Sequence, residues 1–343
     1  LGIKKGDRVA AYLPNIPSTV VVFLATASIG AIWSSCSPEF GTRSVIERFQ
    51  QIKPSILFTT DGYQYGGLEH QLIKKVADIQ NHLPTLKHTV VIPNLTQPPN
   101  LDTLKHFITW DELHTTEQDL DFEPVSFDHP LWILYSSGTT GLPKPIVHGH
   151  GGILLEHLKT LSLHLNLTNE DRFFWFTTTG WMMWNMLASG LLVGASILLY
   201  DGNPGYPDMS TLWRFAQATS MTYFGTGAPY IQACIKAKIE PGKNFNLNNL
   251  KAIGSTAAPL PPESFQWVYE KVKADLLLGS FSGGTDLCTG FVGPCPVLPV
   301  YAGEIQCRCL GASVEAYDET GCSVNNQVGE LMITKPLPSM PLY

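Results

Sequence analysis

Strand-like and helix-like segments alternate along most of this 343-residue chain, and this alternation restricts the fold more than any other feature. Short apolar runs such as 8–14, 55–61 and 88–93 are typical of buried strands. Leucines recur with helical spacing in 152–165. Successive βα units place parallel strands in one sheet with helices on both of its faces. We therefore expect an α/β fold of stacked, mostly parallel sheets with helices on both faces.

The pattern extends through the middle of the chain after a polar, proline-containing connection at 94–130. Further strands are expected at 131–137, 145–150, 171–179, 195–202, 221–227, 250–259 and 275–286. Helices are expected at 18–32, 67–83, 152–165, 181–194, 211–220, 230–238 and 262–272. Several of these strands run directly into loops rich in glycine and hydroxyl residues, where open α/β sheets bind their ligands.

The pattern changes near residue 295, beyond which short strands and turns follow one another without a helix. We divide the chain into an α/β domain at 1–294, itself built of two sheet subdomains, and a small β subdomain at 295–343. The first residue, Leu1, lies just ahead of a strand-like phrase, and the last residues carry no cap or tail. We therefore expect the chain to be a piece of a longer protein, truncated at its N-terminus.

Composition excludes several classes of protein. A hydrophobic content of 44% with 15% charged residues suits a chain with a sizeable core. The formal net charge of −7 argues against nucleic acids and anionic membranes as main partners. The longest apolar run, 19–33, is too short to span a bilayer, so we expect a buried helix there and no membrane span.

Seven cysteines, an odd number, are spread along the chain and do not suggest a disulfide framework. This usage favours a reducing compartment. Cys307 and Cys309 form a C-x-C pair with Cys295 nearby, but ligand-spaced histidines and C-x-x-C pairs are missing. We interpret these residues as thiols rather than as zinc ligands.

The segment 134–152, LYSSGTTGLPKPIVHGHGG, is the most unusual in the sequence. Its glycines allow backbone N–H groups to approach a ligand, and successive N–H groups can form an anion-binding nest. Hydroxyl groups add donors and one lysine adds a full positive charge, a combination that suits a polyphosphate. The residues expected to bind such a polyphosphate are Ser136, Ser137, Gly138, Thr139, Thr140, Gly141 and Lys144.

The segment is neither of the common phosphate-binding motifs. A Walker A loop requires G-x-x-x-x-G-K-[ST], whereas prolines occupy positions 143 and 145 here, and G-x-G-x-x-G is also missing. An unrelated kinase or GTPase is therefore disfavoured. The plain alternative is a surface turn, which the two stiffening prolines and the flanking strands argue against.

The phrase L-Y-S-S-G-T-T-G-L-P-K resembles the AMP-binding signature of the adenylate-forming superfamily, which includes acyl-CoA synthetases, peptide-synthetase adenylation domains and luciferases. The motif is long and specific, and the likeness extends through nearly the whole chain. The resemblance implies an acid–thiol ligase that uses ATP, Mg²⁺ and coenzyme A, with the acid as a further small-molecule substrate. It also implies a mobile C-terminal lid domain, with its hinge and catalytic lysine, beyond residue 343.

Two further segments match the family. The segment 254–265 resembles its adenine-site loop, and 280–286 occupies the place of its aromatic-x-x-T-E motif. By this match Thr285 would join Lys144 as a catalytic residue, and Asp286, one methylene shorter than the usual glutamate, would be a Mg²⁺ ligand. The residues expected on the adenine and ribose side are Ala257, Ala258, Pro259, Ser280, Phe281, Ser282 and Gly284. A strand-to-helix turn at 254–265, and a turn or cap role for Asp286, are the structural alternatives.

The acyl pocket is expected around Trp181, Trp184 and Gly283. Acetate-activating relatives carry bulky tryptophans where this chain has Ser282 and Gly283, so the family comparison predicts room for a longer acid. Plain core packing is the alternative for both tryptophans. His148 and His150 form an H-x-H pair, for which we favour hydrogen bonding or loop packing over metal binding.

Taken together, the motifs resemble most closely the superfamily members that activate acetoacetate, which implies a cytosolic enzyme of lipid and fatty-acid metabolism. Other short acids, such as propionate and butyrate, are the first alternative. A truncated nucleotide-binding isoform without turnover is the second. The chemistry needs no general base because the acid is already ionised, so it depends on positioning and on stabilising phosphate charge.

Overall fold

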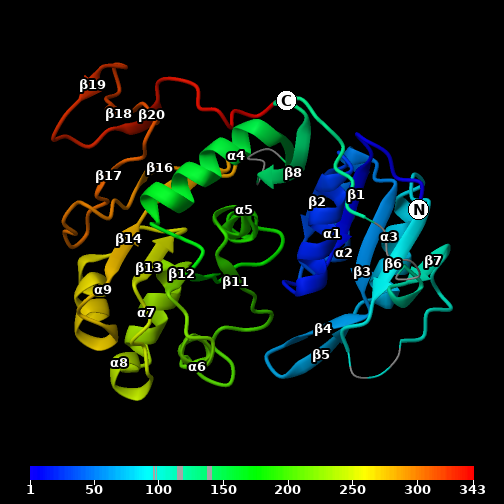
Figure 1. Cartoon of the computed structure of the whole chain (residues 1–343), viewed down its shortest axis with the longest axis horizontal. Helices are drawn as coiled ribbons and strands as arrows, with labels where there is room; N and C mark the ends of the chain where they lie inside the picture. Colours follow the sequence, from blue (N-terminus) through cyan, green and yellow to red (C-terminus); the bar gives the residue numbers. More distant parts are fainter. Residues whose placement is uncertain (96, 98, 114–118, 137–140) are drawn as a thin grey trace.

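The computed structural model describes residues 1–95, 97, 99–113, 119–136 and 141–343. A seven-stranded sheet forms the N-terminal part, with the strand order β7-β6-β3-β1-β2-β8-β9 (Figure 1). Every neighbouring pair in it is parallel except β8 with β9. Its strands are β1 (Arg8–Tyr12), β2 (Ile32–Cys36), β3 (Ile56–Thr60), β6 (His88–Ile92), β7 (Phe107–Thr109), β8 (Pro130–Ser136) and β9 (Lys144–Gly149).

Side chains alternate between the two faces of this sheet, as the period of a strand requires. Along β1, Val9 and Ala11 join one buried cluster, and Ala10 and Tyr12 join another. Helix α1 (Pro17–Ser28) packs in the first cluster, and α2 (Thr42–Ile52) and α3 (Ile73–His82) pack in the second. Helices therefore cover both faces, as the sequence predicts.

A second, five-stranded parallel sheet has the order β11-β10-β12-β13-β14. Its strands are β10 (Arg172–Trp175), β11 (Ser196–Leu198), β12 (Tyr223–Gly227), β13 (Ala252–Thr256) and β14 (Leu277–Ser280). Helices α6 (Thr211–Ala218), α7 (Ala228–Lys236) and α9 (Pro262–Trp267) contribute to a core on one face, and α8 (Pro241–Asn244) follows α7. The other face shares a core with the first sheet, to which α4 (His150–Lys159) and α5 (Met182–Ala188) contribute.

Beyond the second sheet the strands pair in an antiparallel manner. One small sheet holds β15 (Ser282–Gly284), β16 (Thr289–Gly293) and β17 (Cys307–Arg308). Another holds β18 (Val314–Tyr317), β19 (Ser323–Val324) and β20 (Glu330–Ile333). The chain then returns, and Leu342 N donates to the carbonyl of Val147 in β9 at 2.8 Å, which places the C-terminus beside β8 and β9 (Figure 1).

Three local expectations are wrong. The apolar run expected to be one helix ends at Ser28, and the chain re-enters the sheet as β2. The helix expected at 67–83 begins only at Ile73, because β4 (Gly62–Tyr65) and β5 (Leu68–Gln71) form a hairpin closed by Gly66 and Gly67, both with positive φ. Helix α2 lies in a stretch for which the sequence pattern predicted no element.

Two expected helices change hydrogen-bond register along their length. Helix α4 continues as a π-helical turn at Thr160–His164, and α9 does so at Val268–Val272. Helix α5 ends in a 3₁₀ turn at Ser189–Val193, and another 3₁₀ turn occupies Asp111–Leu113. All seven cysteines are free thiols. Within the described residues, no helix combines the length and apolar character needed to cross a membrane.

Candidate active site

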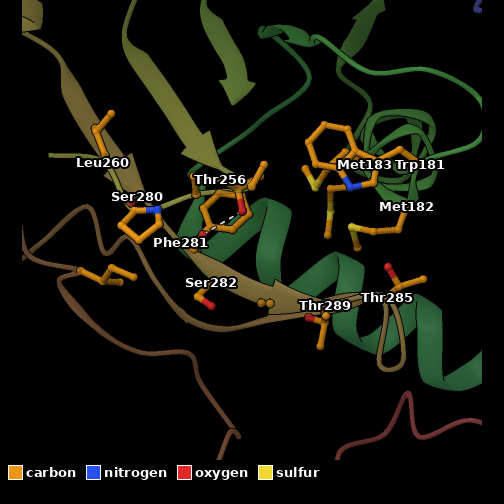
Figure 2. A pocket seen from close by; sticks show the side chains of 18 of the residues that line it. Trp181, Met182, Met183, Thr256, Leu260, Ser280, Phe281, Ser282, Thr285 and Thr289 are labelled. Atoms are coloured by element: carbon orange, nitrogen blue, oxygen red, sulfur yellow. Dashed lines mark hydrogen bonds between the residues drawn. The ribbon is translucent and has the colours of Figure 1, made fainter. Parts of the chain in front are cut away.

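A cavity of about 540 Å³ opens where the second sheet meets helix α5 and the small antiparallel sheet (Figure 2). Strands β13 and β14 end at this cavity, as expected for a ligand site at the carboxyl edge of a parallel sheet. Nine residues that the sequence places at the adenine, acyl and phosphate sites line it together with Trp181: Ala257, Ala258, Pro259, Ser280, Phe281, Ser282, Gly283, Gly284 and Thr285.

Hydrogen bonds fix the two strand ends relative to each other. The hydroxyl of Thr256 donates to the carbonyl of Phe281 at 2.8 Å, and Phe281 N donates to the carbonyl of Ser255 at 3.0 Å (Figure 2). The Phe281 ring is buried, with its centroid 5.3 Å from that of Trp175 beneath it. The loops after β13 and β14 therefore form one rigid wall.

Ala257, the first residue beyond β13, has φ of +73°. A residue with a side chain adopts this left-handed conformation only at an energetic cost, and such strain clusters at binding sites. The residue lies exposed on the cavity wall. The strained turn presents the backbone after β13 toward the space where the sequence analysis expects the nucleotide.

The opposite wall consists of Trp181, just ahead of helix α5, and of Met182, Met183 and Met186 in the helix (Figure 2). Trp184 is not among the described residues that line the cavity. It is fully buried, its ring stacks on Trp33 at 5.9 Å between centroids, and its Nε1–H donates to Asn15 Oδ1 at 3.0 Å. The structure thus brings Trp181 to the cavity and places Trp184 in the core.

Gly283 lines the cavity but has no room for a side chain. A β-carbon built there would lie 2.2 Å from the carbonyl oxygen of Thr289, in the neighbouring strand β16. The absence of a side chain at this position is therefore required by the pairing of β15 with β16. A tryptophan could not be introduced here without moving the backbone. The glycine at position 283 is therefore not evidence for the size of the acyl pocket.

The glycine-hydroxyl segment connects β8 to β9. Ser136 and Lys144 are Cα partners in the antiparallel ladder, and Gly141 has φ of +138°. Lys144 is exposed at the start of β9. Neither of these two partners nor Gly141 is among the described residues that line the cavity. The predicted phosphate-binding residues Ser137, Gly138, Thr139 and Thr140 lie outside the described residues.

Thr285 lines the cavity and the next residue, Asp286, is exposed on the turn between β15 and β16. The described residues contain no cluster of three or more metal-type side chains. Mg²⁺ is commonly held by one or two carboxylates together with substrate phosphates, rather than by a cage of protein ligands. The exposed carboxylate of Asp286, one residue beyond the cavity-lining Thr285, fits that mode of binding.

His148 is fully buried, and its Nε2 lies 2.7 Å from the carbonyl oxygen of Asp286. Burial lowers its pKa, and the hydrogen bond to Asp286 opposes this effect. His150 has a pKa lowered to about 4 by burial and by the nearby His129. The two histidines of the H-x-H pair therefore make different contacts, and His148 has the hydrogen-bonding role that the sequence analysis favours.

Several lining residues were not predicted: Met182, Met183, Met186, Thr256, Leu260, Thr289, Gly290, Gly303, Glu304 and Ile305. The methionines lie within the same motif as Trp181, so the motif contained a usable signal. Residues 303–305 reach the cavity from the connection between β16 and β17, and no local sequence pattern predicts this. Among the described lining residues, Glu304 is the one charged side chain.

These features define a nucleotide-sized cavity at the carboxyl edge of a parallel sheet, lined by the loops after β13 and β14 and by helix α5. The chain matches the family described as "AMP-binding enzyme" over residues 1–343, and it belongs to that family.

The chain is also similar to individual proteins of this family. The chain is 44% identical over its whole length to the acetoacetyl-CoA synthetase of Gallus gallus, and 46% identical over 99% of its length to the acetoacetyl-coenzyme A synthetase of Rhizobium meliloti (strain 1021). The solved structure of the acetoacetyl-CoA synthetase from Streptomyces lividans matches 99% of the chain with a TM-score of 0.94 and 50% identity. The chain spans about half the length of these relatives, between 52% and 53%.

Proposed function

We propose that the protein containing this chain is an ATP-dependent acid–CoA ligase that acts on acetoacetate. The reaction consumes acetoacetate, ATP and coenzyme A and yields acetoacetyl-CoA, AMP and pyrophosphate through an acyl adenylate. The observation that carries this proposal is the gathering of the adenine-side, acyl-side and Thr285 residues around one cavity, in a chain similar throughout to acetoacetyl-CoA synthetases. We further place the enzyme in the cytosol, where its product would serve lipid synthesis.

In the first half-reaction a carboxylate oxygen of acetoacetate attacks the α-phosphorus of ATP and pyrophosphate leaves. Negative charge increases on the phosphate oxygens, so fixed donors and cations lower the barrier. We assign Lys144 and the glycine-hydroxyl segment to the phosphates, and Thr285 to the α-phosphate. Ala257, Ala258, Pro259 and the segment 280–284 would hold the adenine and ribose.

The acid would lie between Trp181 and the glycine strand at 283–284, which line the same cavity. Asp286 would hold Mg²⁺, which supplies positive charge to the phosphates when bound. In the second half-reaction the thiol of coenzyme A attacks the acyl carbonyl and AMP leaves. The C-terminal lid domain expected from the sequence would complete this step.

Pyrophosphate exchange tests the proposal directly. The protein with its expected C-terminal domain is incubated with ATP, radiolabelled pyrophosphate and one acid at a time. Acetoacetate and butyrate form a matched pair, because they share four carbons and differ in the keto oxygen. We expect exchange to be fastest with acetoacetate. Faster exchange with butyrate or propionate would favour the other short-acid ligases, and ATP binding without exchange would favour a nucleotide-binding isoform.

A further inference from the structure

Side chains from other elements hydrogen-bond to the backbone of the turn that carries Thr285 and Asp286. His148 is one of them. Three successive carbonyl oxygens of the turn accept side-chain hydrogen bonds. Asp286 O lies 2.7 Å from His148 Nε2, Leu287 O accepts from Ser339 Oγ at 2.5 Å, and Cys288 O lies 2.8 Å from His157 Nε2. Cys288 itself has φ of +50°, a conformation that residues with side chains adopt only under constraint.

The hydrogen bonds of His148 determine which ring nitrogen carries the proton. Trp132, its Cα partner across the β8–β9 ladder, places the indole Nε1 3.3 Å from His148 Nδ1. An indole N–H can only donate, so Nδ1 must accept and the proton of the neutral ring lies on Nε2. A carbonyl oxygen can only accept, so Nε2–H donates to Asp286 O. Trp132 therefore favours the tautomer of His148 whose Nε2–H donates to the Asp286 carbonyl.

His148 and Lys144 lie on the same strand. They are four residues apart in β9, so their side chains point to the same face and their Cα atoms are about 13 Å apart. One strand thus carries the expected phosphate-binding lysine at its exposed start and the anchor for the Thr285–Asp286 turn in its buried half. Movement of β9 would displace both groups together.

We propose that His148 is a positioning residue, which aligns Thr285 and Asp286 with the phosphate-binding hairpin through its Nε2–H bond to the Asp286 carbonyl. This inference rests on the proposed function, because it assigns the turn to the nucleotide. The side chain is fully buried and is not among the described residues that line the cavity. Loss of the bond should slow adenylation more than it weakens ATP binding, since a misplacement of about 1 Å costs on the order of 100-fold in rate.

Two variants of His148 distinguish a role in positioning the turn from a role in packing the buried site. In His148→Gln the amide nitrogen reaches the place of Nε2 and still donates to Asp286 O. In His148→Asn the shorter amide reaches only the place of Nδ1, so the bond to the turn is lost. Both variants disturb the buried site, so thermal unfolding should report similar destabilisation. We expect His148→Asn to lower kcat for acetoacetate-dependent pyrophosphate exchange roughly 30- to 100-fold with KM for ATP within about threefold, and His148→Gln to recover most of kcat.

Equal kcat in the two variants, or a loss expressed mainly in KM, would overturn the inference. The ¹⁵N NMR signals of the wild-type imidazole provide a test that does not depend on variants folding. We expect a protonated Nε2 and an unprotonated Nδ1, and the reverse assignment would refute the proposed bond. If the wild-type enzyme itself shows no acid-dependent exchange, the proposed function fails, a result distinct from active enzyme with equal variants.

Discussion

Trp175 packs against Gly225, its Cα partner on the neighbouring strand, so closely that a β-carbon at Gly225 would lie 2.0 Å from Cε3 of the indole ring. The next strand continues the row with Gly254, where a β-carbon would lie 2.7 Å from Cζ3 of the same ring. The two glycines leave room for the fully buried Trp175, which in turn lies beneath Phe281 in the cavity wall. The packing of the second sheet therefore determines where the cavity wall lies.

Gly225→Ala should destabilise the protein because the added methyl group forces Trp175 out of its place. Overpacking of this kind typically costs about 1–3 kcal/mol, and we expect the upper part of that range for a ring with no free space. Urea denaturation measures the loss. Gly41→Ala is the matched control, because a β-carbon there meets nothing within 4 Å. It should cost less than about 1 kcal/mol, the size of a weakened helix cap. Equal losses would show that Trp175 can shift freely.

Asp171 links three strands at the edge of the second sheet opposite the cavity. Its carboxylate accepts from Thr168 N and Oγ1 at 2.8 and 3.0 Å, from Thr222 Oγ1 at 2.8 Å and from Lys251 Nζ at 3.0 Å. Burial alone would raise the pKa of Asp171, but these hydrogen bonds together hold it below its usual value. The residue is buried, and its partners immediately precede or flank β10, β12 and β13.

Asp171→Asn should lower the free energy of unfolding by about 2 kcal/mol, because an amide cannot satisfy all four donors. Lys251→Met is the comparison, since it removes only the partner whose side chain is 61% exposed. That change should cost less than about 1 kcal/mol. Urea midpoints at neutral pH provide both values, and a larger loss from Lys251→Met would contradict the importance of the threonine contacts.

Acid should destabilise the fold through His157. Burial lowers its pKa to about 4; the hydrogen bond to the Cys288 carbonyl opposes this effect, and the charges of His148 and Lys159 add to it. An unfolded histidine titrates near pH 6.5. Between pH 6.5 and 4 the unfolded chain binds a proton that folded His157 does not, so stability falls as pH falls through this window. The loss for this residue is about 3 kcal/mol at most.

His157→Gln tests this account, because glutamine retains a donor for the Cys288 carbonyl and does not titrate. Unfolding midpoints measured at intervals from pH 7 to 4.5 should decline less steeply in the variant than in the wild type. The remaining slope belongs to other groups, including His150, whose pKa is also about 4. Parallel declines would show that His157 does not couple to folding.

The parts of the fold that depend on local periodicity could be predicted from the sequence. Strands with dense β-branched or aromatic runs, such as β6 and β10, lie where the sequence placed them. The boundary between α1 and β2 was missed because the run 19–33 was interpreted as one helix, although Gly30, with φ of +65°, lies between the two elements. The helical interpretation of 67–71 is wrong because the Gly66–Gly67 pair closes a hairpin there instead.

The site could be predicted where a motif holds consecutive residues, and less well where its parts come from distant segments. The loops after β13 and β14 were identified as cavity residues, whereas Gly303, Glu304 and Ile305 reach the same cavity through a long return of the chain. Trp181 and Trp184 share one motif, but Trp181 has an extended backbone just ahead of α5, whereas Trp184 lies within the helix and is fully buried. Only the structure separates the cavity residue from the core residue.

Lys144→Ala should slow adenylation about 100-fold, because loss of one preorganised donor to developing phosphate charge typically costs about 3 kcal/mol. Pyrophosphate exchange with acetoacetate measures the rate, and isothermal titration with ATP measures any accompanying loss of affinity. Lys236→Ala, in the last turn of α7, is a control for the removal of one exposed positive charge. Normal exchange in the Lys144 variant would remove this residue from the proposed mechanism.

Trp181→Ala should widen the acid specificity, since Trp181 is the half-buried aromatic side chain at the cavity end of α5. Removing the ring leaves space for additional methylene groups, and each methylene accommodated in an apolar pocket is worth about 1–3 kcal/mol. We expect the ratio of kcat/KM for hexanoate to that for acetoacetate to rise at least about tenfold, with Trp181→Phe giving a smaller increase. A substitution of Trp184 should not widen the specificity in this way, because its ring packs on Trp33 and does not line the cavity.

An unaltered ratio in a folded Trp181→Ala variant would place the end of the acyl pocket elsewhere, with Met182 and Met183 as the next side chains to test.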